Sequence, residues 1–196
     1  MQEYGLVSIG SHTGFWLKEE LKKFSSKKNI LIEPVPYNIV ELKENIKEFD
    51  NTIIEQSAIS DKNELVSFYH IKRNSIGKLK KHWASGIGSF DKSHLLNHRN
   101  KRFLITDEDI EEIKIKCISF DNLKKKYEIK SIDKLMLDVE GAEFKILNSI
   151  NLTKNNIKQI FFEKKHFDGY MKQVEKYEKI KKKFEDCNYT LTDIDK

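Results

Sequence analysis

The chain has 196 residues, of which 38% are hydrophobic and 34% charged, so it is long enough to bury a core without disulfide bonds or a metal ion. Its longest apolar runs, such as Ile30 to Ile32, are far shorter than the roughly 20 residues of a membrane-spanning helix. No secretory leader pattern is visible at its start. We therefore expect a single cytoplasmic domain without a membrane span, in which Cys117 and Cys187 are buried free thiols.

The formal net charge of +5 does not by itself predict a nucleic-acid-binding protein. Nearly all of the positive charge comes from lysine, and the arginines are Arg73, Arg99 and Arg102. Proteins that read nucleic acids more often gather arginine forks and aromatic platforms on one face. We therefore expect no specific nucleic-acid partner.

The first 60 residues alternate between short apolar runs and helical periodicity. This alternation predicts strands joined by right-handed helical crossovers, and hence a parallel sheet. The expected elements are a strand at 6–9, a helix carrying Leu17, Leu21 and Phe24, a strand at 30–32, a helix that starts near Pro36 and carries Ile39, Leu42, Ile46 and Phe49, and a strand at 52–59.

The middle of the chain has a different pattern. Residues 65–71 and 113–119 alternate between apolar and polar side chains, which is typical of half-exposed antiparallel strands. Between them, residues 72–109 are weakly patterned. A segment of that length inside a compact domain predicts a lid or an acceptor-binding insertion.

The alternation of strands and helices then resumes, and it completes the predicted fold class. We expect an α/β domain with a doubly wound, mostly parallel sheet and an inserted antiparallel strand pair. The expected elements are a short helix capped by Ser119, a strand at 135–139, a helix carrying Phe144, Leu147 and Ile150, a strand at 157–162, a helix carrying Met171, Val174, Tyr177, Ile180 and Phe184, and a last candidate strand at 189–194.

Two features follow the first two strands. Gly10 and Gly14 bracket a turn before a helix, where glycine permits a tight bend and a close approach of a ligand to the backbone. Glu33 ends the next strand, where a carboxylate can reach both hydroxyls of a bound ribose. The spacing is G-x-x-x-G instead of G-x-G-x-x-G, which disfavours a dinucleotide, and no phosphate-binding P-loop pattern is present.

Carboxylates also follow two later strands. Asp138 and Glu140 lie at the tip of one strand, and Glu163 ends another, with His166 three residues on. The carboxyl ends of parallel strands share one edge of a sheet, so we expect these groups to face the same crevice as Gly10 and Glu33. Carboxylates crowded at such an edge suit general-base chemistry or cation binding.

Four sequence blocks together resemble the FkbM-type methyltransferases, which belong to the Rossmann-like class that uses S-adenosylmethionine. The blocks occur in the order found in that family and span essentially the whole chain. They are V-S-I-G-S-H-T-G at 7–14, I-E-P-V-P-Y-N at 32–38, Q-S-A-I-S at 56–60 and, most specific, D-K-L-M-L-D-V-E-G-A-E-F-K-I-L at 133–147.

The resemblance implies a role for particular residues. The turn from Gly10 to Gly14 would wrap the methionine end of the cofactor, Glu33 would hold the ribose hydroxyls, and Ser57 and Ala58 would border the adenine. Asp138 and Glu140 would lie beside the methyl group and the acceptor hydroxyl. The full set of expected cofactor-binding residues is Ile9, Gly10, Ser11, His12, Thr13, Gly14, Glu33, Pro34, Ser57, Ala58 and Asp138.

Two departures from the family pattern affect this expectation. The family usually has an acidic residue two places before the first glycine, where this chain has Ser8. The first strand also begins close to Met1. The resemblance therefore implies that residues 72–109 or a second subunit of a homo-oligomer cover the cofactor, or that the site is unusually open.

The function implied by the resemblance is methyl transfer to a hydroxyl of a sugar, glycan or similar small molecule. A hydroxyl is a poor nucleophile, so a base should lie within hydrogen-bond reach of it. Glu140, Asp138, Glu163 and His166 are the candidates, in that order. In an alternative interpretation, Asp138, Glu140 and Glu163 hold Mg²⁺, which lowers the pKa of the acceptor.

Other interpretations stay open. A decayed or truncated methyltransferase that only binds a glycan or a partner protein would also fit Ser8. A nucleic-acid methyltransferase draws on the lysine excess, but the chain lacks the N/D-P-P-Y/F tetrapeptide typical of enzymes that modify base amino groups. We expect no metal at the histidines of the middle segment, His70, His82, His94 and His98, because no tidy ligand spacing is evident.

Overall fold

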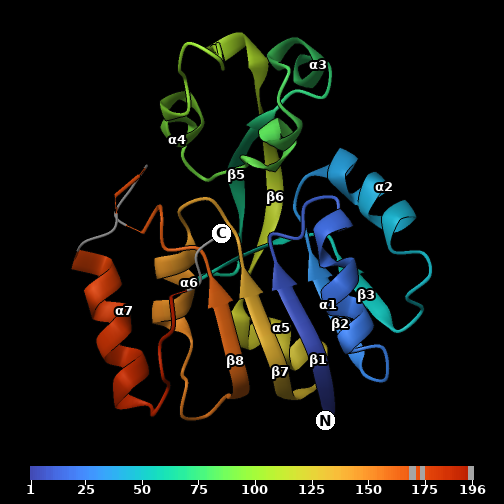
Figure 1. Ribbon diagram of the computed structural model, residues 1–196, viewed down its shortest axis with the longest axis vertical. Coiled ribbons are helices and arrows are strands. Elements are labelled where there is room, and N and C mark those ends of the chain that lie inside the picture. Colours follow the sequence, from blue (N-terminus) through green and yellow to red (C-terminus); the bar gives the residue numbers. More distant parts are fainter. Residues whose placement is uncertain (168–170, 173–174, 194–196) are drawn as a thin grey trace.

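The main sheet has five parallel strands in the order β3-β2-β1-β7-β8 (Figure 1). The computed structural model describes residues 1–167, 171–172 and 175–193. The strands span β1 Gln2–Ile9, β2 Lys28–Ile32, β3 Thr52–Glu55, β7 Ile129–Leu137 and β8 Asn156–Phe162. The order reverses beside β1, which gives the doubly wound arrangement that the sequence predicts.

Helices cover both faces of this sheet, because successive residues of a buried strand point to opposite sides. Leu6 packs with one apolar cluster, whereas the next residue, Val7, packs with another. The Leu6 side is covered by η1 Phe15–Leu17, α1 Lys18–Lys23 and α2 Pro36–Asn45. The Val7 side is covered by α5 Phe120–Lys126, α6 Glu143–Ser149 and α7 Glu175–Asp186.

Local sequence explains where two of these helices begin. Pro36 is the first residue of α2, where its missing N–H leaves no hydrogen bond unmade. Ser119 precedes α5, and its side chain accepts a hydrogen bond from the backbone N–H of Asn122. Both features confirm the sequence prediction.

A second, three-stranded sheet has the order β4-β6-β5. Its strands are β4 Ala58–Ser60, β5 Glu64–Ile71 and β6 Ile110–Ser119. The antiparallel pairing of β5 with β6 confirms the expected inserted pair. The expected single strand at 52–59 is wrong, because the chain turns after Glu55, and Ala58 continues in the second sheet beside Cys117.

The segment between β5 and β6 is ordered and has its own small core. It contains α3 Ser75–Leu79, η2 His82–Gly86, α4 Lys92–Asn97 and η3 Asp107–Asp109. Leu79, Leu95 and Phe103 belong to one buried apolar cluster within it. Figure 1 shows this insertion beyond the arrowheads of β1, β7 and β8, that is, over the carboxyl edge of the main sheet.

The carboxyl-terminal region differs from the prediction in two places. α7 begins at Glu175, so Met171 lies before it, and Val174 falls outside the described residues. Residues 189–193 form no strand, and Ile194 also lies outside the described part. Tyr189 is instead attached through its side chain, whose hydroxyl donates to the backbone carbonyl of Ile157 and whose ring packs on Phe184.

The remaining expectations concern the burial of the two cysteines and the lack of a membrane span. Cys117 is buried, but Cys187 is only partly buried, because it follows the end of the surface helix α7. Within the described residues, no helix is long and apolar enough to cross a bilayer.

Candidate functional site

The carboxyl edge of the main sheet brings together the predicted residues that follow its strands. The backbone N–H of Gly10 donates to the carbonyl of Ile32, and the N–H of Asp138 donates to that of Ile9, each over 3.0 Å. The N–H of Glu163 donates to Leu137 over 3.3 Å. Gly10, Glu33, Asp138 and Glu163 therefore follow neighbouring strands at one edge, as predicted.

The turn after β1 depends on its glycines for two different reasons. Gly10 has φ +81°, and a Cβ there would lie 1.9 Å from the carbonyl oxygen of Asp138. Gly14 has φ +70°, and its Cβ would lie 2.3 Å from Leu42 Cδ1 of α2. The lack of a side chain at Gly10 thus lets β1 and β7 end close together. At Gly14 it lets α2 pack against the turn. Gly14 does not line a cavity at the edge of the sheet.

Glu33 is a buried acid, 5% exposed, with its carboxylate turned toward this turn. It accepts hydrogen bonds from the backbone N–H groups of His12 (2.9 Å) and Val35 (3.0 Å) and from Asn38 Nδ2 (3.1 Å). Burial raises the pKa of Glu33 to about 6, and these hydrogen bonds oppose the rise. A carboxylate offers about four acceptor positions, so three partners leave room for a further donor.

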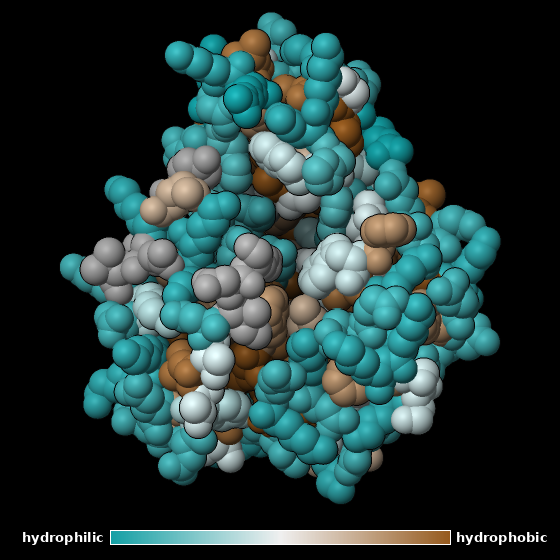
Figure 2. All heavy atoms as spheres, in the orientation of Figure 1, coloured by the Kyte–Doolittle hydropathy of each residue, from teal (hydrophilic) through white to brown (hydrophobic). Residues whose placement is uncertain are grey.

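A small cavity of about 40 Å³ lies beside Glu33. Figure 2 shows a hollow on this face between the insertion and the body of the main sheet. Phe68, Gly86, Gly88 and Phe90 contribute to its walls. The predicted cofactor residues that line it are Ile9, Gly10, Glu33, Pro34, Ser57, Ala58 and Asp138.

The hydroxyl of Ser57 is buried in this wall. Its Oγ atom makes no hydrogen bond of normal geometry with the described residues, but it interacts with the Glu55 carboxylate and helps to lower the pKa of that acid. The wall therefore offers an acceptor at Glu33 and a hydroxyl at Ser57.

A second and larger cavity of about 360 Å³ adjoins the first. The two cavities share Gly10, Glu33, Gly86 and Asp138. Two aromatic side chains, Trp16 and Trp83, contribute to its wall. Its other predicted lining residues are His12, Glu140, Glu163 and His166. Asp138 therefore lies where the two cavities meet.

The remaining predicted residues of the turn have structural contacts. Ser11 Oγ donates to the carbonyl of Ser8 (3.2 Å) and accepts from the N–H of Ile32 (3.1 Å). The carbonyl of Thr13 accepts from Asn45 Nδ2 at 2.8 Å. Ser11, Thr13 and Gly14 line neither cavity. His12 Nε2 lies 2.6 Å from Ser85 Oγ and so joins the turn to the insertion.

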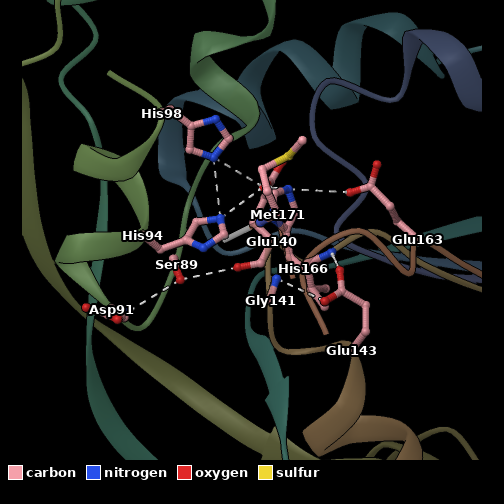
Figure 3. Close-up of polar contacts among 11 residues, drawn as sticks. Ser89, Asp91, His94, His98, Glu140, Gly141, Glu143, Glu163, His166 and Met171 are labelled. Atoms are coloured by element: carbon pink, nitrogen blue, oxygen red, sulfur yellow. Dashed lines mark hydrogen bonds and ion pairs between the residues drawn. The ribbon is translucent and has the colours of Figure 1, made fainter. Parts of the chain in front are cut away.

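Glu140 lies among three histidines (Figure 3). Its Oε2 atom is 3.1 Å from His94 Nε2, 3.6 Å from His166 Nε2 and 3.7 Å from His98 Nε2. Burial is the largest single influence on the pKa of Glu140 and would raise it. The hydrogen bond with His94 and the electrostatic attraction of the three histidines together outweigh burial, and the pKa lies below its ordinary value. Burial lowers the pKa of both His98 and His166 to about 4, so both rings are neutral at pH 7.

Sequence reasoning missed the grouping of His94 and His98 with Glu140. The signal was present, because residues four apart share one face of a helix, and α4 carries His94 with His98 at its carboxyl-terminal cap. What the sequence does not reveal is that the insertion folds back over the tip of β7.

Glu143 positions the loop that carries Glu140. Its side chain is fully buried and accepts hydrogen bonds from the backbone N–H groups of Val139 and Gly141, each at 2.9 Å. Burial raises the pKa of Glu143 to about 7. These contacts help hold Glu140 at φ +51°, a left-handed conformation that is uncommon for a residue with a Cβ.

Comparison with known proteins gives one match. The family model described as "Methyltransferase FkbM domain" matches residues 8–191 of the 196-residue chain. No curated protein and no solved structure matches it.

Proposed function

The chain belongs to the FkbM methyltransferase family, and from this premise we propose that it transfers a methyl group from S-adenosylmethionine to a hydroxyl oxygen of a sugar or glycan. The observation that carries this proposal is the meeting of two cavities at Asp138, at the carboxyl edge of the sheet. Ligands of open α/β sheets bind at that edge, where the strand order reverses.

The first cavity has a donor set suited to the cofactor. Glu33 would accept hydrogen bonds from the ribose hydroxyls, since its carboxylate retains an acceptor position. Ser57 and Ala58, which line this cavity, would border the adenine. When bound, S-adenosylmethionine supplies a methyl group on a positively charged sulfur. The Gly10 turn would leave that sulfur open to the second cavity.

The second cavity has features suited to a sugar acceptor. A sugar ring has an apolar C–H face and a rim of hydroxyl groups. Trp16 and Trp83 offer flat apolar surfaces for that face, while Glu163, Lys165 and His98 offer partners for the hydroxyls. Placing the acceptor oxygen about 3 Å from the methyl carbon contributes as much as any base does.

Asp138 is the base that we propose. It lines both cavities, as Glu33 does, but Glu33 is assigned to the ribose hydroxyls. Glu140, the first candidate from the sequence, is less suited because His94 already hydrogen-bonds its carboxylate and its pKa is lowered. Asp138 would take the hydroxyl proton as the oxygen bonds to the methyl carbon and the methyl–sulfur bond breaks, with S-adenosylhomocysteine as the leaving group.

Mass spectrometry tests this proposal directly. The full chain, incubated with S-adenosylmethionine and a panel of sugars, should yield a product heavier by one methyl group. Asp138→Asn should lower turnover roughly 100-fold or more. Asp133→Asn is the matched control, because Asp133 lies on the same strand but pairs with Lys27 and Lys158 away from the cavities.

A non-catalytic binding module is the alternative outcome. Ser8, which replaces the usual family acid, is 1% exposed and brings no carboxylate to the cofactor's amino-acid end. Cofactor binding without methyl transfer to any sugar in the panel would favour this alternative. Absence of cofactor binding would overturn the transfer reaction and would fit a module that binds only a glycan or a partner protein.

A further inference from the structure

The three histidines around Glu140 form a compact set of metal-binding groups, which we call the histidine cluster: His94, His98, His166 and Glu140. One ligand atom from each residue lies within 4.8 Å of all the others. The residues come from three separate segments, namely α4 with its cap, the loop after β7 and the loop after β8 (Figure 3). Their convergence is therefore a product of the fold.

The distances within the histidine cluster approach those of a metal site. Four ligands at about 2.0–2.1 Å around a tetrahedral ion lie about 3.3 Å from one another. Here His98 Nε2 lies 3.4 Å from His94 Nε2, and Glu140 Oε2 lies 3.1 to 3.7 Å from the three imidazole nitrogens. The two remaining distances, from His166 to the other two imidazoles, are within 4.8 Å. The four groups must therefore draw closer together to surround one ion.

The chemistry of the donors selects the class of ion. Imidazole nitrogen suits Zn²⁺ and its neighbours among the divalent transition metals, whereas Mg²⁺ prefers a shell of oxygen atoms. We propose that His94, His98, His166 and Glu140 bind one divalent transition-metal ion of the Zn²⁺ type. This set differs from the three carboxylates considered for Mg²⁺ above.

His166 is the ligand that must change most when the ion binds. Its Nδ1 accepts a hydrogen bond from the backbone N–H of Met171 at 3.1 Å, so the neutral ring carries its proton on Nε2. Coordination through Nε2 moves that proton to Nδ1 and breaks the contact with Met171. His94 and Glu140 should therefore contribute more to affinity than His166 does.

The position of the histidine cluster gives the ion a role, which rests on the proposed function. Glu140, His98 and His166 line the cavity assigned to the acceptor. An ion held there would bind the acceptor oxygen in a fifth position and lower the pKa of its hydroxyl group. Asp138 would still receive the proton.

Metal binding is measured without any methyl transfer. The full chain, stripped with a chelator and dialysed, is titrated with Zn²⁺ by calorimetry, and with Co²⁺ followed by its visible absorption. We expect one ion to bind per chain. The visible absorption should be that of Co²⁺ with a low coordination number. His98→Ala and Glu140→Gln should each weaken Zn²⁺ binding at least roughly 100-fold, since losing groups that merely orient ligands costs 10–100-fold.

His82→Ala is the matched control, because His82 is an exposed histidine of the same insertion outside the histidine cluster. It should bind Zn²⁺ like the unmodified chain. Glu140→Gln keeps the shape of the side chain, and so it decides the question if His98→Ala does not fold. The proposal is overturned if no ion binds stoichiometrically, or if Glu140→Gln and His82→Ala bind Zn²⁺ equally well.

The failure of this proposal is distinguishable from the failure of the proposed function. Zn²⁺ binding that needs Glu140, in a chain that never methylates a sugar, would leave the metal site standing and remove the transfer reaction. Methylation by a chain that binds no ion would leave the transfer reaction standing and remove the metal site.

Discussion

The carboxylate of Glu33, at the end of β2, accepts a hydrogen bond from the backbone N–H of His12, with the two atoms 2.9 Å apart. His12 has φ +50°, a left-handed conformation that costs energy for a residue with a Cβ. Glu33 therefore helps to hold the turn after β1 in the shape that borders both cavities. The same carboxylate is the group that we assign to the ribose, so the shape of the turn and cofactor affinity depend on one side chain.

Cofactor affinity should depend on pH through Glu33. Burial raises the pKa of Glu33 to about 6, and only the ionised form makes the strong charge-assisted hydrogen bonds to hydroxyl groups. Calorimetric affinity for S-adenosylmethionine should therefore fall as the pH is lowered from about 7 to about 5, with its midpoint near the pKa of Glu33. A flat profile over this range would contradict the assignment.

The same shift has a consequence for folding of the free chain. A carboxyl with a raised pKa in the folded state binds more protons there than in the unfolded state. The stability that Glu33 contributes should be complete below its ordinary pKa of 4.5 and lost as the pH rises to about 6. Urea titration below pH 4.5 and above pH 6 measures the free energy of unfolding on the two sides of this transition. The part of the difference that Glu33 contributes should be missing in Glu33→Gln.

Gly10→Ala should destabilise the fold at the edge of the sheet. A Cβ would lie 1.9 Å from the Asp138 carbonyl oxygen, at φ +81°. The left-handed conformation alone costs about 1–2 kcal/mol, and the clash forces β1 and β7 apart, so the loss should exceed about 2 kcal/mol. Gly77→Ala is the control: no atom lies within 4 Å of its Cβ, and a helical alanine should stabilise by up to about 1 kcal/mol. Equal urea midpoints for the two variants would refute this account.

Trp16→Ala should weaken acceptor binding more than turnover. Trp16 lines the acceptor cavity, whereas its neighbour Phe15 is 70% exposed and lines neither cavity. Loss of one aromatic contact, worth about 0.5–1.5 kcal/mol, should raise the KM for the sugar roughly 2- to 10-fold. Steady-state kinetics of Trp16→Ala and Phe15→Ala make the comparison, with Trp16→Phe expected to recover part of the affinity. An unchanged KM in Trp16→Ala would remove the proposed sugar platform.

The parallel sheet and its shared edge were predictable from the sequence, because both follow from local patterns. Short apolar runs ending in Gly10, Glu33, Asp138 and Glu163 identify the strands and their carboxyl ends. The direction of parallel strands then brings those residues together without any knowledge of side-chain contacts. Alternating polarity likewise predicted the antiparallel pairing of β5 with β6.

Features that depend on distant contacts were not predictable in this way. The run from Thr52 to Ile59 is continuous in composition, and only pairing with two different sheets divides it after Glu55. Tyr189 is held by its side chain, which leaves no periodic pattern. The approach of His94 to Glu140 depends on how the insertion folds back, and its 3.1 Å contact joins residues 46 positions apart.

The most direct test of the central claim, that the cavity beside Glu33 binds S-adenosylmethionine, is a calorimetric titration of three forms of the full chain. The unmodified chain should bind one molecule, and Glu33→Gln should bind roughly 10- to 100-fold more weakly, as expected from losing charged hydrogen bonds worth about 1.5–3 kcal/mol. Asp133→Asn should bind normally, because Asp133 pairs with Lys27 and Lys158 and lines neither cavity. No binding to the unmodified chain, or equal affinity of the two variants, would contradict the account.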